Sequence, residues 1–324
     1  MFIGNIIVMV YAIIYCNTLS FKKETDTLKL FEKIDEDLFG LKLGKEMKRK
    51  NDFLKKATIS LAFFNYFIFY FLSTISIYFG FNRIDEELSW KLYETMAPIM
   101  IISTTKSKFY VSALIFKTRT QIINEFLKQK INNCSSHIKQ LEKLEVDIEI
   151  ALKIHKKIVD AVRHLNNVFG FMILITFILS FILLLSDGYI VLYCLTVGKE
   201  NNLFHIFSST RLLLFYSVEL FLSMRTTTLL CAEVNETKNI LFNVKIEPEN
   251  VDTRNVIMVS VFKLMHDKLE LKACELFNMD LTFVFSMFAS LTTYLLILLQ
   301  FDIDSIQRKA ANFLINETIS LSID

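Results

Sequence analysis

The sequence predicts an all-α protein built as a polytopic membrane helical bundle, and three observations support this fold class. Hydrophobic residues make up 53% of the 324 residues and the mean hydropathy is +0.41, which is too apolar for an ordinary soluble domain. The apolar residues are gathered in runs that are long enough to cross a bilayer as helices. Only 7 glycines and 2 prolines are present, so the turns that a membrane β-barrel needs are scarce.

Six stretches are predicted to span the membrane. Three of them contain no charged residue; they are 1–21, 57–82 and 281–301. At about 1.5 Å per residue, each of these covers the hydrocarbon core of roughly 30 Å. The other three carry charged residues within an apolar run; they are about 92–116, 168–195 and 203–232.

Lysine and arginine alternate sharply between successive connections. Segments 22–56, 117–163 and 238–272 hold eleven, ten and six of them, whereas the other connections and the C-terminal tail together hold five. The positive-inside rule therefore places the three basic segments in the cytosol and both termini outside. The glycosylation sequon at Asn316 is then extracellular and the one at Asn235 is cytosolic. The net charge of +2 indicates no nucleic-acid partner.

The basic connections are not expected to be disordered. Residues 118–165 carry apolar residues at helical spacing, with charges at the positions between them. One interpretation is a solvated helical hairpin. The interpretation we favour is that the spanning helices continue into the cytosol and pack there, because isolated helices in water are marginally stable.

The last predicted span carries a narrow polar stripe. Its members recur at helical spacing and so share one face of an otherwise apolar helix; they are Ser286, Ser290, Thr293, Ile297, Gln300 and Asp304. In lipid, a polar stripe must face other helices or water.

Five charged residues within the predicted spans are candidate functional residues, because charge is costly in a bilayer; they are Lys106, Lys108, Arg211, Glu219 and Arg225. For the two lysines and Arg225, the alternative is that the side chain reaches the cytosolic surface. Arg211 and Glu219 are eight residues apart, roughly on one helix face but too distant to pair directly. Arg211 lies nearer the outside, where it could meet a polar ligand.

No motif for catalysis or for metal binding is found in the sequence. The five cysteines form no CxxC pair, and the five histidines form no HxxxH or HExxH pattern. We therefore predict no metal site, no cofactor and no enzymatic activity.

The end of the last span resembles a known signature. Thr293-Tyr294, five apolar residues and then Gln300-Phe301 are similar to the motif that ends the insect gustatory receptors. Weaker similarity to that family covers most of the chain; it is found at 31–44, 160–173, 231–237 and 273–280. The family has seven spans, and 1–21 matches its second. The resemblance thus implies that the first span has no counterpart here, through a truncated gene model or a lost helix.

The resemblance implies a ligand-gated cation channel in the cell membrane of chemosensory neurons. Its partners would be a small-molecule tastant and other gustatory receptor subunits, with which it would form a homo- or heterotetramer in the lipid bilayer. The last helix would line one central pore, with Gln300 and Phe301 at its narrowest part and Ile297 below them. Asp302 would contribute a carboxylate ring at the outer mouth, whereas Tyr294 would act as a structural wedge.

The same resemblance implies a domain organisation. The predicted parts are spans with a cytosolic loop 22–56 in 1–116, a cytosolic helical loop 117–165, spans in 166–232, a cytosolic loop and anchor helix 233–280, the pore-lining span 281–301 and an extracellular tail 302–324.

Alternatives remain for the function and for the gate residues. The chain could instead be a non-conducting modulatory subunit or a truncated non-functional chain. A receptor coupled to G proteins is disfavoured, because the charge pattern places the C-terminus outside. Gln300 and Phe301 could also be an interfacial hydrogen-bonding residue and an aromatic anchor.

Overall fold

The computed structural model of the chain describes residues 21–63, 71, 86–133, 138–197, 202–244 and 251–321. These residues form seven helices and one small hairpin, which confirms the predicted all-α class. The elements in chain order are α2 (Phe21–Gly40), α3 (Gly44–Phe63), α5 (Glu86–Asn132), α6 (Ile138–Val197), α7 (Asn202–Phe242), α8 (Val251–His266), β1 (Lys272–Ala273), β2 (Phe277–Asn278) and α9 (Leu281–Leu321).

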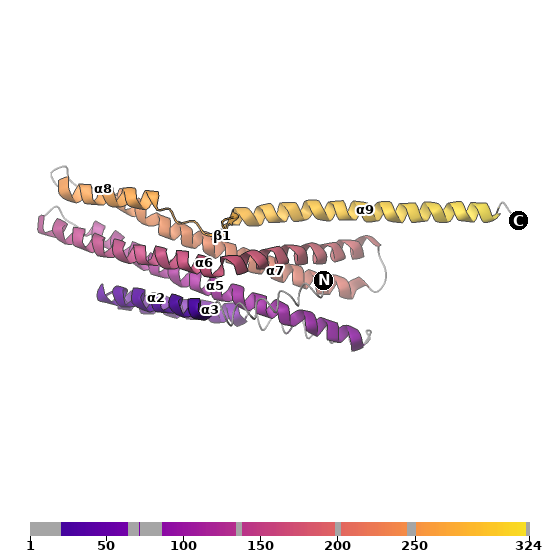
Figure 1. The fold of residues 1–324 in the computed structure, drawn as a ribbon, viewed down its shortest axis with the longest axis horizontal. Helices are drawn as coiled ribbons and strands as arrows, with labels where there is room; N and C mark the ends of the chain where they lie inside the picture. Colours follow the sequence, from indigo (N-terminus) through magenta and orange to yellow (C-terminus); the bar gives the residue numbers. More distant parts are fainter. Residues whose placement is uncertain are drawn as a thin grey trace.

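Three long helices form the centre of the molecule. α5, α6 and α7 contain 47, 60 and 41 residues and run side by side (Figure 1). At about 1.5 Å per residue, α6 is roughly 90 Å long, three times the thickness of the hydrocarbon core. The basic segment 138–165 and the apolar run 168–195 are therefore one continuous helix. This confirms that a spanning helix continues into the basic region.

Three of the described helices are long and apolar enough to cross a membrane. They are Lys143–Thr196 within α6, Ile206–Phe242 within α7, and Leu281–Asp304 within α9. They contain the predicted spans 168–195, 203–232 and 281–301, apart from the first residues of the second. The predicted span 92–116 lies in α5, which does not reach the same apolarity. The predicted spans 1–21 and 57–82 lie largely outside the described residues.

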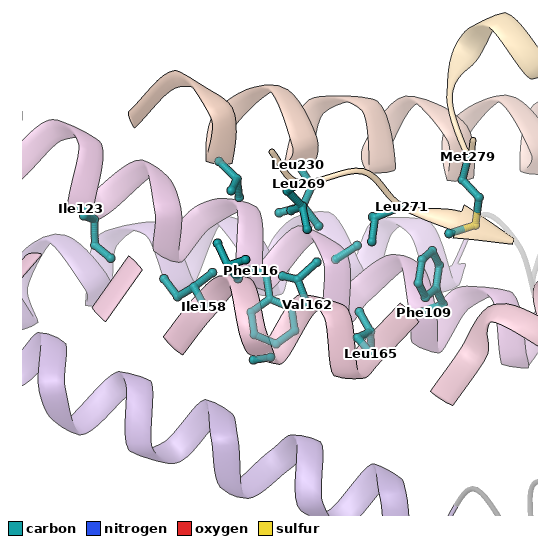
Figure 2. Packing of buried hydrophobic residues seen from close by; sticks show 14 of the residues in the cluster. Phe109, Phe116, Ile123, Ile158, Val162, Leu165, Leu230, Leu269, Leu271 and Met279 are labelled. Carbon is teal, nitrogen blue, oxygen red and sulfur yellow. The ribbon is translucent and has the colours of Figure 1, made fainter. Parts of the chain in front are cut away.

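The apolar core runs through the half of the bundle that contains the basic segments and continues between the apolar runs of α6, α7 and α9. Figure 2 shows Phe116 of α5 and Ile158 of α6 close to Leu230 of α7, with Leu269 from the segment after α8. All four are buried, and Phe116 and Ile158 have no exposed surface. Burial of apolar area contributes about 25 cal/mol per Å² to stability. These contacts therefore stabilise helices that would be marginally stable in water by themselves.

A short hairpin connects α8 to α9. β1 and β2 pair antiparallel, with Lys272 opposite Asn278. The turn holds Cys274 at φ 50° and Glu275 at φ 60°, a left-handed conformation that non-glycine residues rarely adopt. No glycine or proline marks this turn, so sequence reasoning missed it.

The beginning of α9 is fixed to α7 by hydrogen bonds. Asp280 caps the helix, since its Oδ1 accepts from the Phe283 amide at 3.0 Å. The Thr227 hydroxyl donates to the Met279 carbonyl oxygen at 2.6 Å. From this point α9 extends beyond the hairpin and away from α8 (Figure 1).

Candidate functional site

One face of α9 packs on its own chain and the opposite face is open. Val284, Met287 and Leu291 are buried against α6 and α7, with exposed fractions of 3–7%. Thr293 lies nine residues after Val284, which is two and a half helical turns, so the two side chains leave opposite sides of the helix. Thr293 and Gln300 are both exposed. The predicted polar stripe therefore points away from the subunit that carries it.

The hydroxyl groups of the stripe are satisfied within the helix. Ser286, Ser290 and Thr293 each donate to the carbonyl oxygen four residues earlier, at 3.0, 3.0 and 3.1 Å. Hydroxyls bonded in this way can lie at membrane depth without an unsatisfied donor. Their oxygen atoms make the surface mildly polar, so the stripe tolerates either water or a second helix.

The residues predicted at the gate fall into two groups. Ile297, Gln300 and Phe301 are exposed, and Phe301 retains 69% of its surface. Asp302 lies on the other side of α9, where its Oδ2 accepts a hydrogen bond from the hydroxyl of Tyr189 on α6. Asp302 therefore ties the middle of α9 to α6, whereas Gln300 and Phe301 are exposed.

Tyr294 contacts the neighbouring helix. Its ring meets Phe181 of α6 edge to face, with centroids 6.2 Å apart. Tyr294 is still 53% exposed, so it packs on its own chain with only one edge.

A buried ion pair joins α5 to α7. Lys106 Nζ lies 3.1 Å from Glu219 Oε2, and both side chains are under 10% exposed. Lys106 also donates to Ser180 Oγ on α6 at 2.9 Å, and Ser103 donates to Glu219 Oε1 at 2.6 Å. The interpretation that Lys106 reaches the cytosolic surface is wrong, because Glu219 and Ser180 hold it inside the bundle. Lys108, by contrast, is exposed.

Arg211 faces the interior of the bundle. It is 8% exposed, and Asp187 of α6 and Tyr216 of α7 lie near it. Within the described residues, Asp187 Oδ2 and the Tyr216 hydroxyl have no hydrogen-bond partner. Arg225, the last of the five charged candidates, is exposed.

The sequence analysis did not predict the polar partners of these charged residues. Ser103 and Ser180 are two of many hydroxyl residues, and each contacts a residue more than 70 positions away. The only local signal is the spacing of Ser103 and Lys106, which places both on one face of α5.

A cavity lies between α2, α3, α5 and α6. Its volume is about 580 Å³ and its walls are mainly apolar. Polar residues also line it; they are Thr27, Asp35, Thr58, Thr104, Ser107, Lys108, Ser112 and Arg119. No sequence pattern predicted this cavity, because its walls come from four helices.

Known proteins show similarity over most of the chain. The model of the 7tm chemosensory receptor family matches residues 1–305. Gustatory receptor 28b of Drosophila melanogaster is 27% identical over 165 residues, which cover 49% of this chain. The match spans only 35% of that receptor's length. The solved structure of the insect olfactory receptor OR5 from Machilis hrabei has the same fold, with a TM-score of 0.61 at 13% identity. That alignment covers 90% of this chain and 80% of the olfactory receptor.

Proposed function

Because the chain belongs to the 7tm chemosensory receptor family, we propose that it is a gustatory receptor subunit of a tastant-gated cation channel in the cell membrane. The observation that carries this proposal is the polar stripe of α9, which is exposed directly opposite the buried face of the same helix. In lipid such a stripe needs water or protein against it. A central pore formed by several copies of α9 supplies both.

Four subunits would bring four copies of the stripe around one axis. Ile297 and Gln300 then face the axis, and Phe301 lies one position, or about 100°, further around the helix. A small rotation of α9 would exchange the Phe301 ring for the Gln300 amide. A ring of phenylalanines closes a pore by excluding water, whereas a ring of amides admits it.

The part of α9 that follows Phe301 would concentrate cations. Asp304 lies on the stripe, so its carboxylates would form a ring at the mouth, which we place on the extracellular side. Asp302 would add negative charge from the α6-facing side, where Tyr189 holds it.

We propose that the ligand meets Arg211. This residue lies near Asp187 and Tyr216 inside the bundle, and the group offers both charge signs and a hydroxyl. Replacing Arg211 with Gln should raise the ligand concentration for half-maximal current and leave the conductance of single openings unchanged.

The gate can be tested by comparing two phenylalanines. Phe301→Ala should raise the current without ligand, because it removes the apolar constriction. Phe285→Ala is the matched control, since Phe285 is on the same helix and is 68% exposed but lies away from the stripe. Currents are recorded from cells that express each variant, with surface expression measured in parallel.

The charge ring can be tested at the two aspartates. Asp304→Lys should lower the cation conductance more than Asp302→Lys does, because Asp304 faces the axis. Unchanged leak and conductance in well-expressed Phe301 and Asp304 variants would remove α9 from the conduction path. A chain that passes no current alone but alters the current of a co-expressed receptor would instead be a modulatory subunit.

A further inference from the structure

The side of α3 that faces away from the bundle is strongly basic. α3 packs against α5 (Figure 1), and its buried face includes Met47 and Leu54, which are 3% and 7% exposed. Five cations are exposed on the other side and form what we call the basic strip; they are Lys45, Lys48, Arg49, Lys55 and Lys56. The first and last are eleven positions apart, about three helical turns, so the strip is about 17 Å long. Asp52 is also exposed on this face.

The basic strip has no acidic partner in the described part of the chain. Nearby cations that face into the bundle are paired, since Lys50 lies 2.7 Å from Glu125 and Arg119 lies 2.6 Å from Asp35. By contrast, no ion pair or hydrogen bond joins a side chain of the strip to another described residue. Five cations and one exposed carboxylate leave a net charge of +4 on this face. That charge is balanced by ions of the solvent or by another molecule.

The basic strip begins where the membrane ends. Thr58 of α3 and Phe169 of α6 line the same cavity, so they lie at about the same level of the bundle. Phe169 is at the start of the apolar run 168–195, and Thr58 is at the start of the apolar run 57–82. The last two cations of the strip are therefore level with the phospholipid headgroups, on the side that the positive-inside rule assigns to the cytosol.

The length of the basic strip indicates a headgroup that projects from the membrane surface. At 1.5 Å per residue, Lys48 and Arg49 lie about 10 Å further from the membrane than Lys55 and Lys56. The attraction of an anionic surface falls off within a Debye length, which is about 8 Å at physiological ionic strength. Phosphatidylserine would therefore engage only the last two cations. An inositol ring that carries further phosphates extends deeper into the cytosol and offers several negative charges together.

We propose that the basic strip of α3 binds a polyphosphorylated inositol phospholipid of the cytosolic leaflet. The phosphate of its glycerol backbone would lie at Lys55 and Lys56, and the phosphates of its inositol ring at Lys48 and Arg49. Lysine and arginine form charge-assisted hydrogen bonds with phosphate oxygens. Clusters of about four to eight such cations immediately cytosolic of a spanning helix suit these headgroups. The carboxylate of Asp52, in the middle of the strip, would weaken the binding.

The experiment uses the full chain in phosphatidylcholine nanodiscs and measures its affinity for a short-chain phosphatidylinositol bisphosphate and for short-chain phosphatidylserine. Each cation near a charged membrane surface contributes about fivefold in affinity, from about 1 kcal/mol. The bisphosphate should therefore bind about thirtyfold more tightly than phosphatidylserine, because it reaches two more cations. Lys48→Gln with Arg49→Gln should remove this preference, and Lys55→Gln with Lys56→Gln should weaken the binding of both lipids.

Two further variants serve as controls for general loss of charge and for misfolding. Lys153→Gln with Lys156→Gln removes two exposed cations of α6 that lie roughly 20 Å or more beyond the level of Phe169, and it should leave both affinities unchanged. Asp52→Asn should tighten the binding of the bisphosphate by about fivefold, because it removes an acidic residue of the same face. A misfolded chain would not bind more tightly.

Four results would overturn the proposal. They are no binding by the unchanged chain, equal affinity for the two lipids, full affinity after loss of Lys55 and Lys56, and no tightening by Asp52→Asn. Inositol trisphosphate and a polyglutamate peptide are added as soluble competitors. If inositol trisphosphate binds as tightly as the lipid, the site recognises free phosphates, and if the peptide displaces the lipid at equal concentration, it recognises an acidic protein. No current or tastant is measured, so the outcome is independent of the proposed channel function.

Discussion

Replacing Lys106 with Met should destabilise the protein by about 3–5 kcal/mol, because the Glu219 carboxylate is then buried without its cation. The structure supports this magnitude. The side chains of Lys106 and Glu219 are 5% and 7% exposed, so water does not screen the pair. Among the residues that the structure describes, only Ser103, at 2.6 Å, would remain to solvate the carboxylate. Glu219→Leu should cost a similar amount, since Ser180 is then the one described hydrogen-bond partner left to the ammonium.

The double variant Lys106→Met with Glu219→Leu should recover most of that loss. Replacing both members of a buried ion pair by apolar residues of similar size is often neutral or stabilising. The hydroxyl groups of the two remaining serines keep a hydrogen-bond acceptor. Ser180 Oγ donates to the Thr176 carbonyl oxygen at 2.7 Å, and Ser103 can donate to the carbonyl oxygen four residues before it. The two single changes should therefore be strongly non-additive.

The assay is heat unfolding of the purified protein in detergent, followed by the fraction that remains monodisperse in size-exclusion chromatography. Lys128→Met serves as the control, because Lys128 is exposed on the same helix and its replacement should change stability by no more than about 0.5 kcal/mol. A double variant that is destabilised by the sum of the two single changes would refute the reasoning, since it would show that the two residues act independently.

Three further predictions follow from the described contacts. Asn235→Ala should lower stability by about 1–3 kcal/mol in the same heat-unfolding assay, because the Asn235 amide exchanges two hydrogen bonds of 3.1 Å with the Leu269 backbone. In a glycosylation assay, Asn316 should be modified and Asn235 should not, and sugar at Asn235 would reverse the predicted orientation. Tyr189→Phe should raise the current without ligand, because it releases Asp302 and with it the middle of α9 from α6; an unchanged current would show that this bond does not restrain the gate.

The periodicity of the sequence was sufficient to predict the helices and the residues that share the polar face of α9. An apolar run and a basic run with the same 3.6-residue spacing predicted one helix, and α6 confirms it over 138–197. The stripe of α9 could also be placed, because Thr293, Ile297 and Gln300 must share a face in any helix. These inferences need only the geometry of a single helix.

Contacts between helices could not be predicted in the same way. Lys106 is separated from Glu219 by 113 positions, and nothing local to either residue indicates the other. The position of Asp302 shows a related limit. The sequence places it next to Phe301, yet one helical step of 100° is enough to turn it toward α6 and Tyr189. The residue that each side chain contacts depends on how the helices pack against one another. The residues next to it in the sequence do not indicate that packing.

The polar groups of the spanning helices fall into two kinds, and the difference suits a moving helix. Lys106 and Glu219 form an ion pair between α5 and α7, so any sliding of these helices would leave a buried charge unpaired. The hydroxyls of α9 bond within α9, so they move with it and lose nothing when its neighbours change. Rotation of α9 would cost apolar contacts and the outer bond from Tyr189, while the Thr227 bond to Met279 holds its inner end. The structure thus combines a bundle whose register is fixed by a buried ion pair with a last helix whose own hydroxyl groups would not oppose a turn about its axis.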